Sequence, residues 1–244
     1  MKLISVKNLS KKFRRTQNQQ TAFGFLNNLF LKKDEFYALK NISFSVSSGD
    51  IVGIVGPNGS GKTTLLRILA GLYSKTDGTV AINGKVAAFL HTNVALENEL
   101  DAYENIFLLG MIMGINKKDI EANLKKIIDF AEIRKFIRTP LRDFSTGMIQ
   151  RLVLSILMYV EADIFLLDEL IEASDFKFKE RSYKKILKKI SVGHKAAIFC
   201  SHELDIIERF CNKAMLLDKG KLIKFGPTAK VIKLYERSQQ NNSQ

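Results

Sequence analysis

The stretch GPNGSGKT, Gly56–Thr63, decides the fold, because it fits the phosphate-loop pattern G-x-x-x-x-G-K-[ST]. A short, wholly apolar run, Ile51–Val55, precedes it, and a helical pattern, Thr63–Leu72, follows it. This order of strand, glycine-rich loop and helix separates a phosphate site from a glycine-rich turn with a chance lysine. The sequence therefore predicts an α/β core built around a phosphate-binding loop (P-loop).

In such a loop, glycines let successive backbone N–H groups turn inward around a phosphate, and the following helix N-terminus adds partial positive charge. We expect Lys62 to reach the β- and γ-phosphate oxygens and the Thr63 hydroxyl to ligate Mg²⁺. The predicted ATP-binding residues of the loop are Gly56, Pro57, Asn58, Gly59, Ser60, Gly61, Lys62, Thr63 and Thr64.

The composition of the chain limits its class. Its 244 residues are 46% apolar and 26% charged, which is enough for a full core in one large domain or two small ones. The net charge of +13 suits contact with phosphate, nucleic acid or an anionic membrane surface. Two cysteines cannot build a disulfide framework, the first residues lack a signal-peptide pattern, and the longest apolar runs are too short to span a bilayer. We expect a cytosolic, reduced chain that does not itself cross a membrane.

Two alternating segments precede the loop. Lys2–Asn8 alternates as an edge strand does, and Ala38–Val46 alternates again. The insert between them, residues 10–36, repeats apolar residues at helical spacing around Phe25 and Phe30. This pattern predicts a short amphipathic helix.

The rest of the chain alternates helical and strand signals. Residues from about 88 to 160 are mostly helix-patterned and predict an inserted helical lobe, whereas Ile164–Leu167 and Ala196–Cys200 are typical of buried parallel strands. The polar tail, residues 238–244, is expected to be disordered. We therefore expect a single domain over residues 1–244: an α/β P-loop core with N-terminal antiparallel strands and an α-helical lobe.

Two acids, Asp168 and Glu169, end the first of these buried runs, where P-loop enzymes place the carboxylate that holds Mg²⁺. On this interpretation Asp168 is a metal ligand with Thr63, and Glu169 polarises the attacking water as a general base. A hydrophobic run that ends in two acids is also a common strand terminus, so the assignment of the acid pair depends on the presence of the P-loop.

The stretch FSTGMIQRL, Phe144–Leu152, lies upstream of the acid pair. Ser145 can cap a helix, and the small Gly147 allows an anion to approach the free N–H groups there. The stretch is similar to the LSGGQ signature of ABC transporter ATP-binding subunits, in a variant form that ends in Gly-Met. The resemblance implies a head-to-tail dimer that holds two ATP, in which the γ-phosphate on one P-loop meets the signature of the opposed subunit. The residues expected to act in trans are Ser145, Thr146, Gly147 and Met148.

Further matches follow in the order of that family. Asp175 resembles the D-loop aspartate, and His202, after the strand Ala196–Cys200, resembles the switch histidine that contacts the γ-phosphate. The resemblance thus implies that Glu169, His202 and Lys62 carry the hydrolysis of ATP.

Two positions depart from the family pattern or stay open. His91 stands where the family usually has a glutamine, and because Mg²⁺ prefers oxygen ligands we expect His91 to position water or couple motions instead. Phe13 lies where the aromatic residue that stacks on adenine commonly follows the first strand, with Phe36 and Tyr37 as alternatives.

The long insert, the stretch Tyr103–Ile106 and the Ser-Thr-Gly-Met signature together resemble the ATP-binding subunits of bacterial polysaccharide exporters, which move O-antigen, capsular polysaccharide or teichoic acid. The resemblance implies a homodimer on the cytoplasmic face of the inner membrane, separate transmembrane permease subunits, a lipid-linked polysaccharide as substrate and no nucleic acid. The insert helix would then lie near the membrane, although a helix packed on its own domain would show the same pattern. The chain is expected to end too soon for the C-terminal carbohydrate-binding domain of some O-antigen members.

Two other functions share these motifs. A soluble ABC ATPase acting on nucleic acid or the ribosome would suit the basic charge, but such proteins usually carry two cassettes or a long coiled coil, and the sequence has one motif set and no sustained heptads. An ABC subunit for a small solute would share every catalytic motif and differ only in the insert and the lobe.

Overall fold

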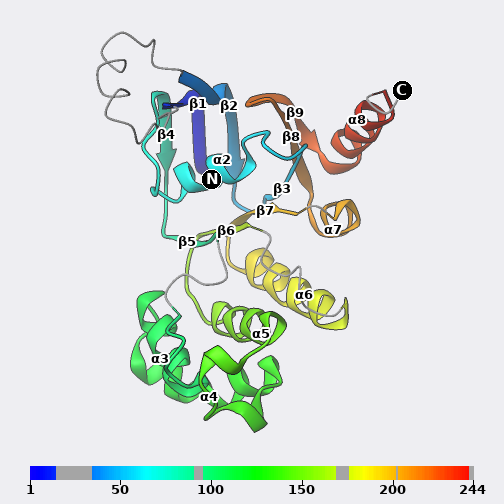
Figure 1. The fold of residues 1–244 in the computed structure, drawn as a ribbon. Coiled ribbons are helices and arrows are strands. Elements are labelled where there is room, and N and C mark those ends of the chain that lie inside the picture. Colours follow the sequence, from blue (N-terminus) through cyan, green and yellow to red (C-terminus); the bar gives the residue numbers. More distant parts are fainter. Residues whose placement is uncertain (15–34, 91–95, 169–175, 202, 242–244) are drawn as a thin grey trace, which may run out of the picture.

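The computed structural model describes residues 1–14, 35–90, 96–168, 176–201 and 203–241 (Figure 1). The elements in chain order are β1 (Lys2–Arg14), β2 (Glu35–Ser47), β3 (Ile51–Val55), α2 (Lys62–Leu69), β4 (Asp77–Ile82), β5 (Val86–Phe89), α3 (Ala102–Ile112), α4 (Lys117–Ala131), the 3₁₀ helices η1 (Arg134–Phe136) and η2 (Leu141–Asp143), α5 (Thr146–Leu157), β6 (Ile164–Asp168), α6 (Phe176–Val192), β7 (Ala196–Cys200), α7 (Leu204–Phe210), β8 (Lys213–Asp218), β9 (Lys221–Pro227) and α8 (Thr228–Asn241).

The strands form two sheets. Sheet A is antiparallel, with the order β2-β1-β4, and sheet B has the order β5-β6-β7-β3-β8-β9, in which only β9 runs antiparallel to its neighbour. The predicted α/β core with N-terminal antiparallel strands is confirmed. The prediction of an edge strand at Lys2–Asn8 is wrong, because β4 pairs with the free side of β1 and makes β1 the central strand.

The inner strands β3, β6 and β7 of sheet B are buried on both faces, which explains why they read as short hydrophobic runs. Along β6, Ile164 and Leu166 join a core that contains sheet A and α2. Phe165 and Leu167, which alternate with these two residues along the strand, join the core formed by the helices from α3 to α8. Successive side chains of a strand point to opposite faces, so one short strand serves both cores.

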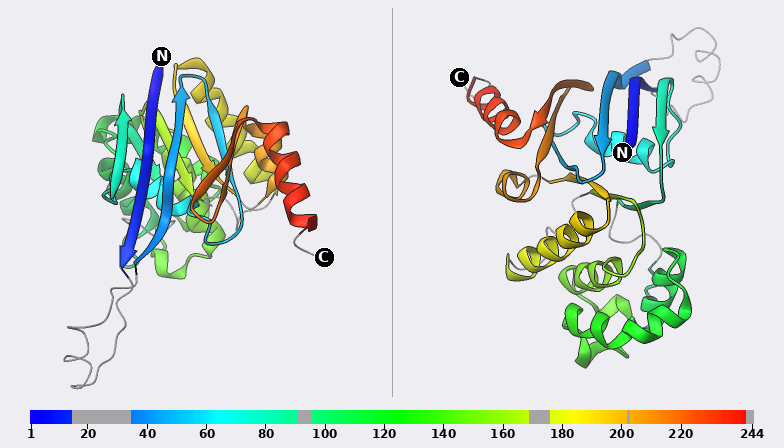
Figure 2. Two further views of the ribbon diagram at one scale, coloured as in Figure 1. Left: turned by 90° about the horizontal axis from the view of Figure 1, so that it is seen from above. Right: turned by 180° about the vertical axis from the view of Figure 1, so that it is seen from behind.

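The helical lobe begins later than expected. Its helices α3, α4 and α5 contact one another at one end of the molecule, and both views of Figure 2 show them grouped together. The predicted lobe began near residue 88, but Val86–Phe89 is strand β5. None of the helices in the described ranges combines the length and the apolar character that a bilayer crossing requires.

Two segments differ in part from the prediction. Strands β1 and β2 continue through Arg14 and from Glu35, so both ends of the expected insert belong to sheet A, and the predicted helix of the insert falls outside the described residues. The tail from Ser238 to Asn241, expected to be disordered, continues α8, where the Ser238 hydroxyl donates to the Tyr235 carbonyl at 2.6 Å.

Both cysteines are buried and neither is in a disulfide, with exposures of 3% for Cys200 and 8% for Cys211. Burial disfavours the thiolate and raises the pKa of Cys211 to about 12. Because the thiolate is the reactive form, we expect native protein to resist alkylation by iodoacetamide at mildly alkaline pH, and both cysteines to react once guanidinium unfolds the chain. Mass spectrometry counts the adducts, and rapid labelling of Cys211 in native protein would contradict this burial.

Candidate nucleotide site

The P-loop turns through backbone conformations that only glycine adopts easily. Between β3 and α2, Gly56, Gly59 and Gly61 have φ of 146°, 75° and 105°. A Cβ on Gly56 would lie 2.0 Å from the carbonyl oxygen of Leu217, and one on Gly61 would lie 2.6 Å from that of Ala38. The loop is therefore held tightly between the strands β8 and β2, and its shape depends on the glycines.

The loop holds two polar side chains away from water. Lys62 is 7% exposed, and its Nζ donates to the carbonyl oxygens of Gly56 at 2.8 Å and Pro57 at 3.1 Å. Ser60 is 2% exposed, and its Oγ is buried without a hydrogen-bond partner among the described residues. A buried ammonium and an unpaired hydroxyl beside a glycine cradle fit an anion such as a phosphate.

A cavity of about 600 Å³ opens over the loop. Its lining combines the loop with an aromatic wall from β1 and β2 and with one residue after β8: Asn58, Gly59, Gly61, Lys62, Thr63, Thr64, Phe13, Phe36, Tyr37, Ala38 and Lys219. The structure thus brings most of the predicted loop residues together with all three aromatic candidates. A cavity with phosphate donors at one end and flat apolar rings at the other suits a nucleotide.

The aromatic wall is a packed cluster. The ring centroids of Phe13 and Phe36 are 5.9 Å apart, and Phe36 and Tyr37 are each 45% exposed. The Lys12 ammonium lies 4.9 Å from the Tyr37 ring and 3.3 Å from a Glu35 carboxylate oxygen. Tyr37 and Glu35 together raise the pKa of Lys12, and Lys12 lowers that of Glu35. Since all three predicted aromatics line the cavity, the choice among them stays open.

The β8–β9 turn also forms part of the site, which the sequence patterns did not indicate. Gly220 donates its N–H to the Ser60 carbonyl at 3.1 Å, and its own carbonyl accepts from the Lys40 N–H at 2.7 Å. The turn thereby ties the P-loop to β2 and brings Lys219 to the cavity. The Asp218–Gly220 stretch between two apolar runs is a hairpin signal, but its distance from the loop in sequence hides the contact.

The carboxylate of Asp168 ends β6 and is 7% exposed, next to β7 in sheet B. The other predicted residues of this region, Glu169, Asp175, His202 and His91, lie outside the described residues. Their roles stay predictions.

The signature begins α5 as expected. Ser145 is the N-cap residue, and its Oγ accepts a hydrogen bond from the Met148 N–H at 3.2 Å. Ser145 and Thr146 are exposed, so the N-terminus of α5 is open to a ligand.

The signature and the P-loop lie on opposite faces of sheet B. Leu65 and Leu66 of α2 belong to the core with sheet A, whereas Leu152 and Leu154 of α5 belong to the core of the helical lobe. In Figure 1 and the right-hand view of Figure 2, strands of sheet B lie between α2 and α5. One chain thus keeps its signature away from its own P-loop.

Comparison with known proteins identifies the family. The sequence pattern of the ABC transporter family matches residues 39–172, which is more than half of the chain. The chain belongs to the ABC transporter family. Membership makes it an ATP-binding protein and an ATPase.

Several relatives of this ABC ATPase cover most of it. The O-antigen export system ATP-binding protein RfbB of Klebsiella pneumoniae is 33% identical over 85% of this chain and 84% of that protein. The teichoic acids export ATP-binding protein TagH of Bacillus anthracis is 38% identical over 88% of this chain, and that of Staphylococcus haemolyticus is 31% identical over 96%. The chain spans 88% of the S. haemolyticus protein but 39% of the B. anthracis one.

Solved structures share the fold of the ABC ATPase. A dimeric ATP-binding cassette bound to ADP and phosphate superposes with a TM-score of 0.76, at 22% identity, over 93% of this chain and 99% of that one. The ATP-binding subunit of an ABC transporter superposes with a TM-score of 0.77, at 22% identity, over 96% of this chain and 93% of that one.

Substitution of Gly56 tests the geometry of the P-loop, and the same substitution at a second glycine serves as the control. We expect Gly56→Ala to abolish ATP binding and to lower the free energy of unfolding by about 2 kcal/mol or more, because the new Cβ meets a backbone oxygen at 2.0 Å. Gly226→Ala, where no atom lies within 4 Å, should change that free energy by about 0.5 kcal/mol at most. Thermal unfolding and titration with a fluorescent ATP analogue measure both effects, and normal ATP binding by Gly56→Ala would contradict the assignment of the cradle.

Proposed function

We propose that this chain is the ATP-hydrolysing subunit of a bacterial ABC transporter that exports lipid-linked polysaccharide. The similarity to the O-antigen and teichoic acid export proteins, over 85% to 96% of the chain, carries the substrate class. The cavity that joins the P-loop to an aromatic wall supports ATP as the energy source. On this proposal the chain works as a homodimer with a separate transmembrane permease, on the cytoplasmic face of the inner membrane.

ATP binding follows from the described part of the cavity. The loop N–H groups, the Ser60 hydroxyl and the N-terminus of α2 would surround the β-phosphate. In this structure the Lys62 ammonium donates hydrogen bonds to the carbonyl oxygens of Gly56 and Pro57. When ATP binds, it would donate to phosphate oxygens instead. The base would lie on the aromatic wall of Phe13, Phe36 and Tyr37.

The residues available for a cation fit Mg²⁺. Thr63 offers a hydroxyl oxygen in the cavity, and Asp168 offers a carboxylate at the end of β6. Oxygen donors of this kind, few in number and completed by phosphates and water, are what Mg²⁺ prefers. When bound, Mg²⁺ supplies positive charge that offsets the negative charge of the phosphates.

Hydrolysis needs a second chain on this proposal. Ser145, Thr146, Gly147 and Met148 of one chain would hold the γ-phosphate on the P-loop of the other, since each chain keeps these two parts on opposite faces of sheet B. Glu169 would orient and deprotonate the attacking water, His202 would contact the γ-phosphate, and Asp175 would lie at the dimer interface. His91 would position water or couple the site to the permease. Closure of the dimer would then drive the permease.

The substrate class is tested in cells. We expect bacteria that lack this protein to lose surface polysaccharide and to retain lipid-linked polymer inside, because the polymer is made but not moved. Wild-type protein should restore export, and Lys62→Ala, which lacks the phosphate-binding ammonium, should not. Staining of surface glycan and extraction of lipid-linked polymer measure the two pools. A normal surface without retained polymer would remove the polysaccharide assignment and favour transport of a small solute.

The role of Glu169 is tested with purified protein. We expect Glu169→Gln to bind ATP with normal affinity and to reduce the hydrolysis rate by about 100-fold or more, because the general base is lost. The variant should accumulate as an ATP-bound dimer in size-exclusion chromatography, whereas wild-type protein should return to monomer as it hydrolyses ATP. Hydrolysis by Glu169→Gln at the normal rate would show that another group serves as the base.

A further inference from the structure

The stretch Tyr103–Ile106, near the start of α3, carries a buried amide at its third position. Asn105 is 0% exposed, and its Oδ1 accepts from the Glu97 N–H at 2.8 Å. Its Nδ2 faces three backbone carbonyl oxygens, those of Glu97 at 3.0 Å, Leu100 at 3.1 Å and Asp101 at 3.0 Å. One side chain therefore fixes the backbone of residues 97–101, and its removal would leave several buried polar groups without a partner.

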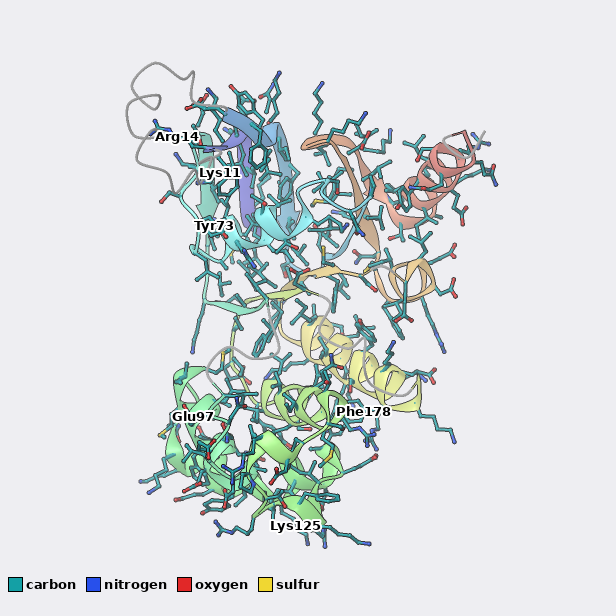
Figure 3. All side chains as sticks on the ribbon, viewed as in Figure 1. Lys11, Arg14, Tyr73, Glu97, Lys125 and Phe178 are labelled. Carbon is teal, nitrogen blue, oxygen red and sulfur yellow. The ribbon has the colours of Figure 1, made fainter. Side chains whose placement is uncertain are left out.

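The segment fixed by Asn105 pairs in turn with residues 137–142. The Leu141 N–H donates to the Leu100 carbonyl at 3.1 Å, and the Arg142 N–H donates to the Asn98 carbonyl at 3.0 Å. Asp101 and Pro140 form an isolated β-bridge. We call these two paired segments, residues 97–101 and 137–142, the lobe junction. Figure 3 shows Glu97 at the α3 side of the helical lobe.

Exposed side chains cross the same junction. Arg138 donates to the Asp101 carboxylate at 3.2 Å, and its guanidinium lies 4.3 Å from the centroid of the Tyr103 ring. Arg142 pairs with Glu99. The two arginine side chains are 68% and 56% exposed, so they connect the two segments at the surface, while the buried Asn105 amide holds residues 97–101 in place beneath them.

The junction leads directly into the signature. From Arg142 the chain passes through the last residues of η2 and the buried Phe144, and Ser145 then caps α5. Two residues between Arg142 and Ser145 leave little freedom, because Phe144 is 8% exposed and its N–H donates to the Leu141 carbonyl at 3.0 Å. The position of the lobe junction therefore determines the position of Ser145, the N-cap residue of the signature helix.

We propose that Asn105 is a positioning residue for the signature, acting through the lobe junction on the site that the signature forms with the other chain. This inference rests on the proposed action of Ser145 in trans. The P-loop that binds ATP within the same chain lies across sheet B from the junction, whose helix α3 belongs to the core of the lobe. Loss of Asn105 therefore lowers turnover and dimer closure and leaves the binding of ATP to the single chain unchanged.

The experiment separates these two quantities. We expect Asn105→Ala to lower kcat by about tenfold or more, since small displacements of a catalytic group are costly, while the affinity of the monomer for a fluorescent ATP analogue stays within about twofold. In the Glu169→Gln background, Asn105→Ala should reduce the ATP-trapped dimer. Asn123→Ala is the matched control, because that asparagine lies in the same lobe and is partly exposed, with its amide on the Asp119 carbonyl within α4.

A second pair of variants tests the junction without opening a buried site. Arg138→Ala combined with Arg142→Ala removes both surface connections and should lower kcat by about two- to threefold, as expected for exposed ion pairs, with unchanged ATP affinity. Arg134→Ala is the control, because its pair with Asp129 joins the end of α4 to η1 outside the junction, and it should behave as wild type. If circular dichroism shows that Asn105→Ala does not fold, the comparison of the Arg138/Arg142 double variant with Arg134→Ala tests the positioning role instead.

The outcomes distinguish two failures. Equal kcat for the Arg138/Arg142 double variant and Arg134→Ala, or ATP affinity that falls together with kcat in Asn105→Ala, would overturn the positioning role. Ser145→Arg, which blocks the signature, should abolish turnover. If Ser145→Arg hydrolysed ATP normally, the action of the signature in trans would be wrong, whatever the Asn105 variants show.

Discussion

The backbone of the P-loop is the constraint on which the rest of the structure depends. Gly56 and Gly61 take conformations with positive φ while carbonyl oxygens of β8 and β2 lie where a Cβ would be. The strand β3, which leads into the loop, pairs with β7 and β8 inside sheet B, and the β8–β9 turn is bonded to Ser60. The same contacts place the aromatic wall and Lys219 around one cavity, so the fold and the nucleotide site have a common origin.

The second organising feature is the separation of two cores by sheet B. Phosphate binding belongs to the side with sheet A and α2, whereas the signature belongs to the side with the helical lobe. On the proposed function, two chains arranged head to tail bring the P-loop of one chain to the signature of the other. On this account the lobe junction matters because it sets how each chain presents Ser145 to the other.

Local patterns predicted the local parts of this structure well. The P-loop, the buried strands Ile164–Leu167 and Ala196–Cys200, and the cap at Ser145 depend on neighbouring residues, so the sequence alone indicated them. The central place of β1 depends on pairing with β4, and the contacts of Gly220 with Ser60 and Lys40 depend on segments that meet only after folding. The polar end of α8 shows that composition alone does not decide disorder. Which residues of the nucleotide site act chemically stays a prediction for Glu169 and His202, which lie outside the described residues.

The central claim is that each ATP site is built from the P-loop of one chain and the signature of another. The most direct measurement mixes two inactive variants, Lys62→Ala and Ser145→Arg, and follows ATP hydrolysis. Each variant alone should be inactive, because both of its sites carry a defect. A mixed dimer contains one site with both defects and one site with none, so the account predicts that mixing restores up to a quarter of the wild-type rate, since half of the dimers are mixed and one of their two sites is intact. No gain in rate on mixing, with mixed dimers demonstrated by differential tagging, would contradict it.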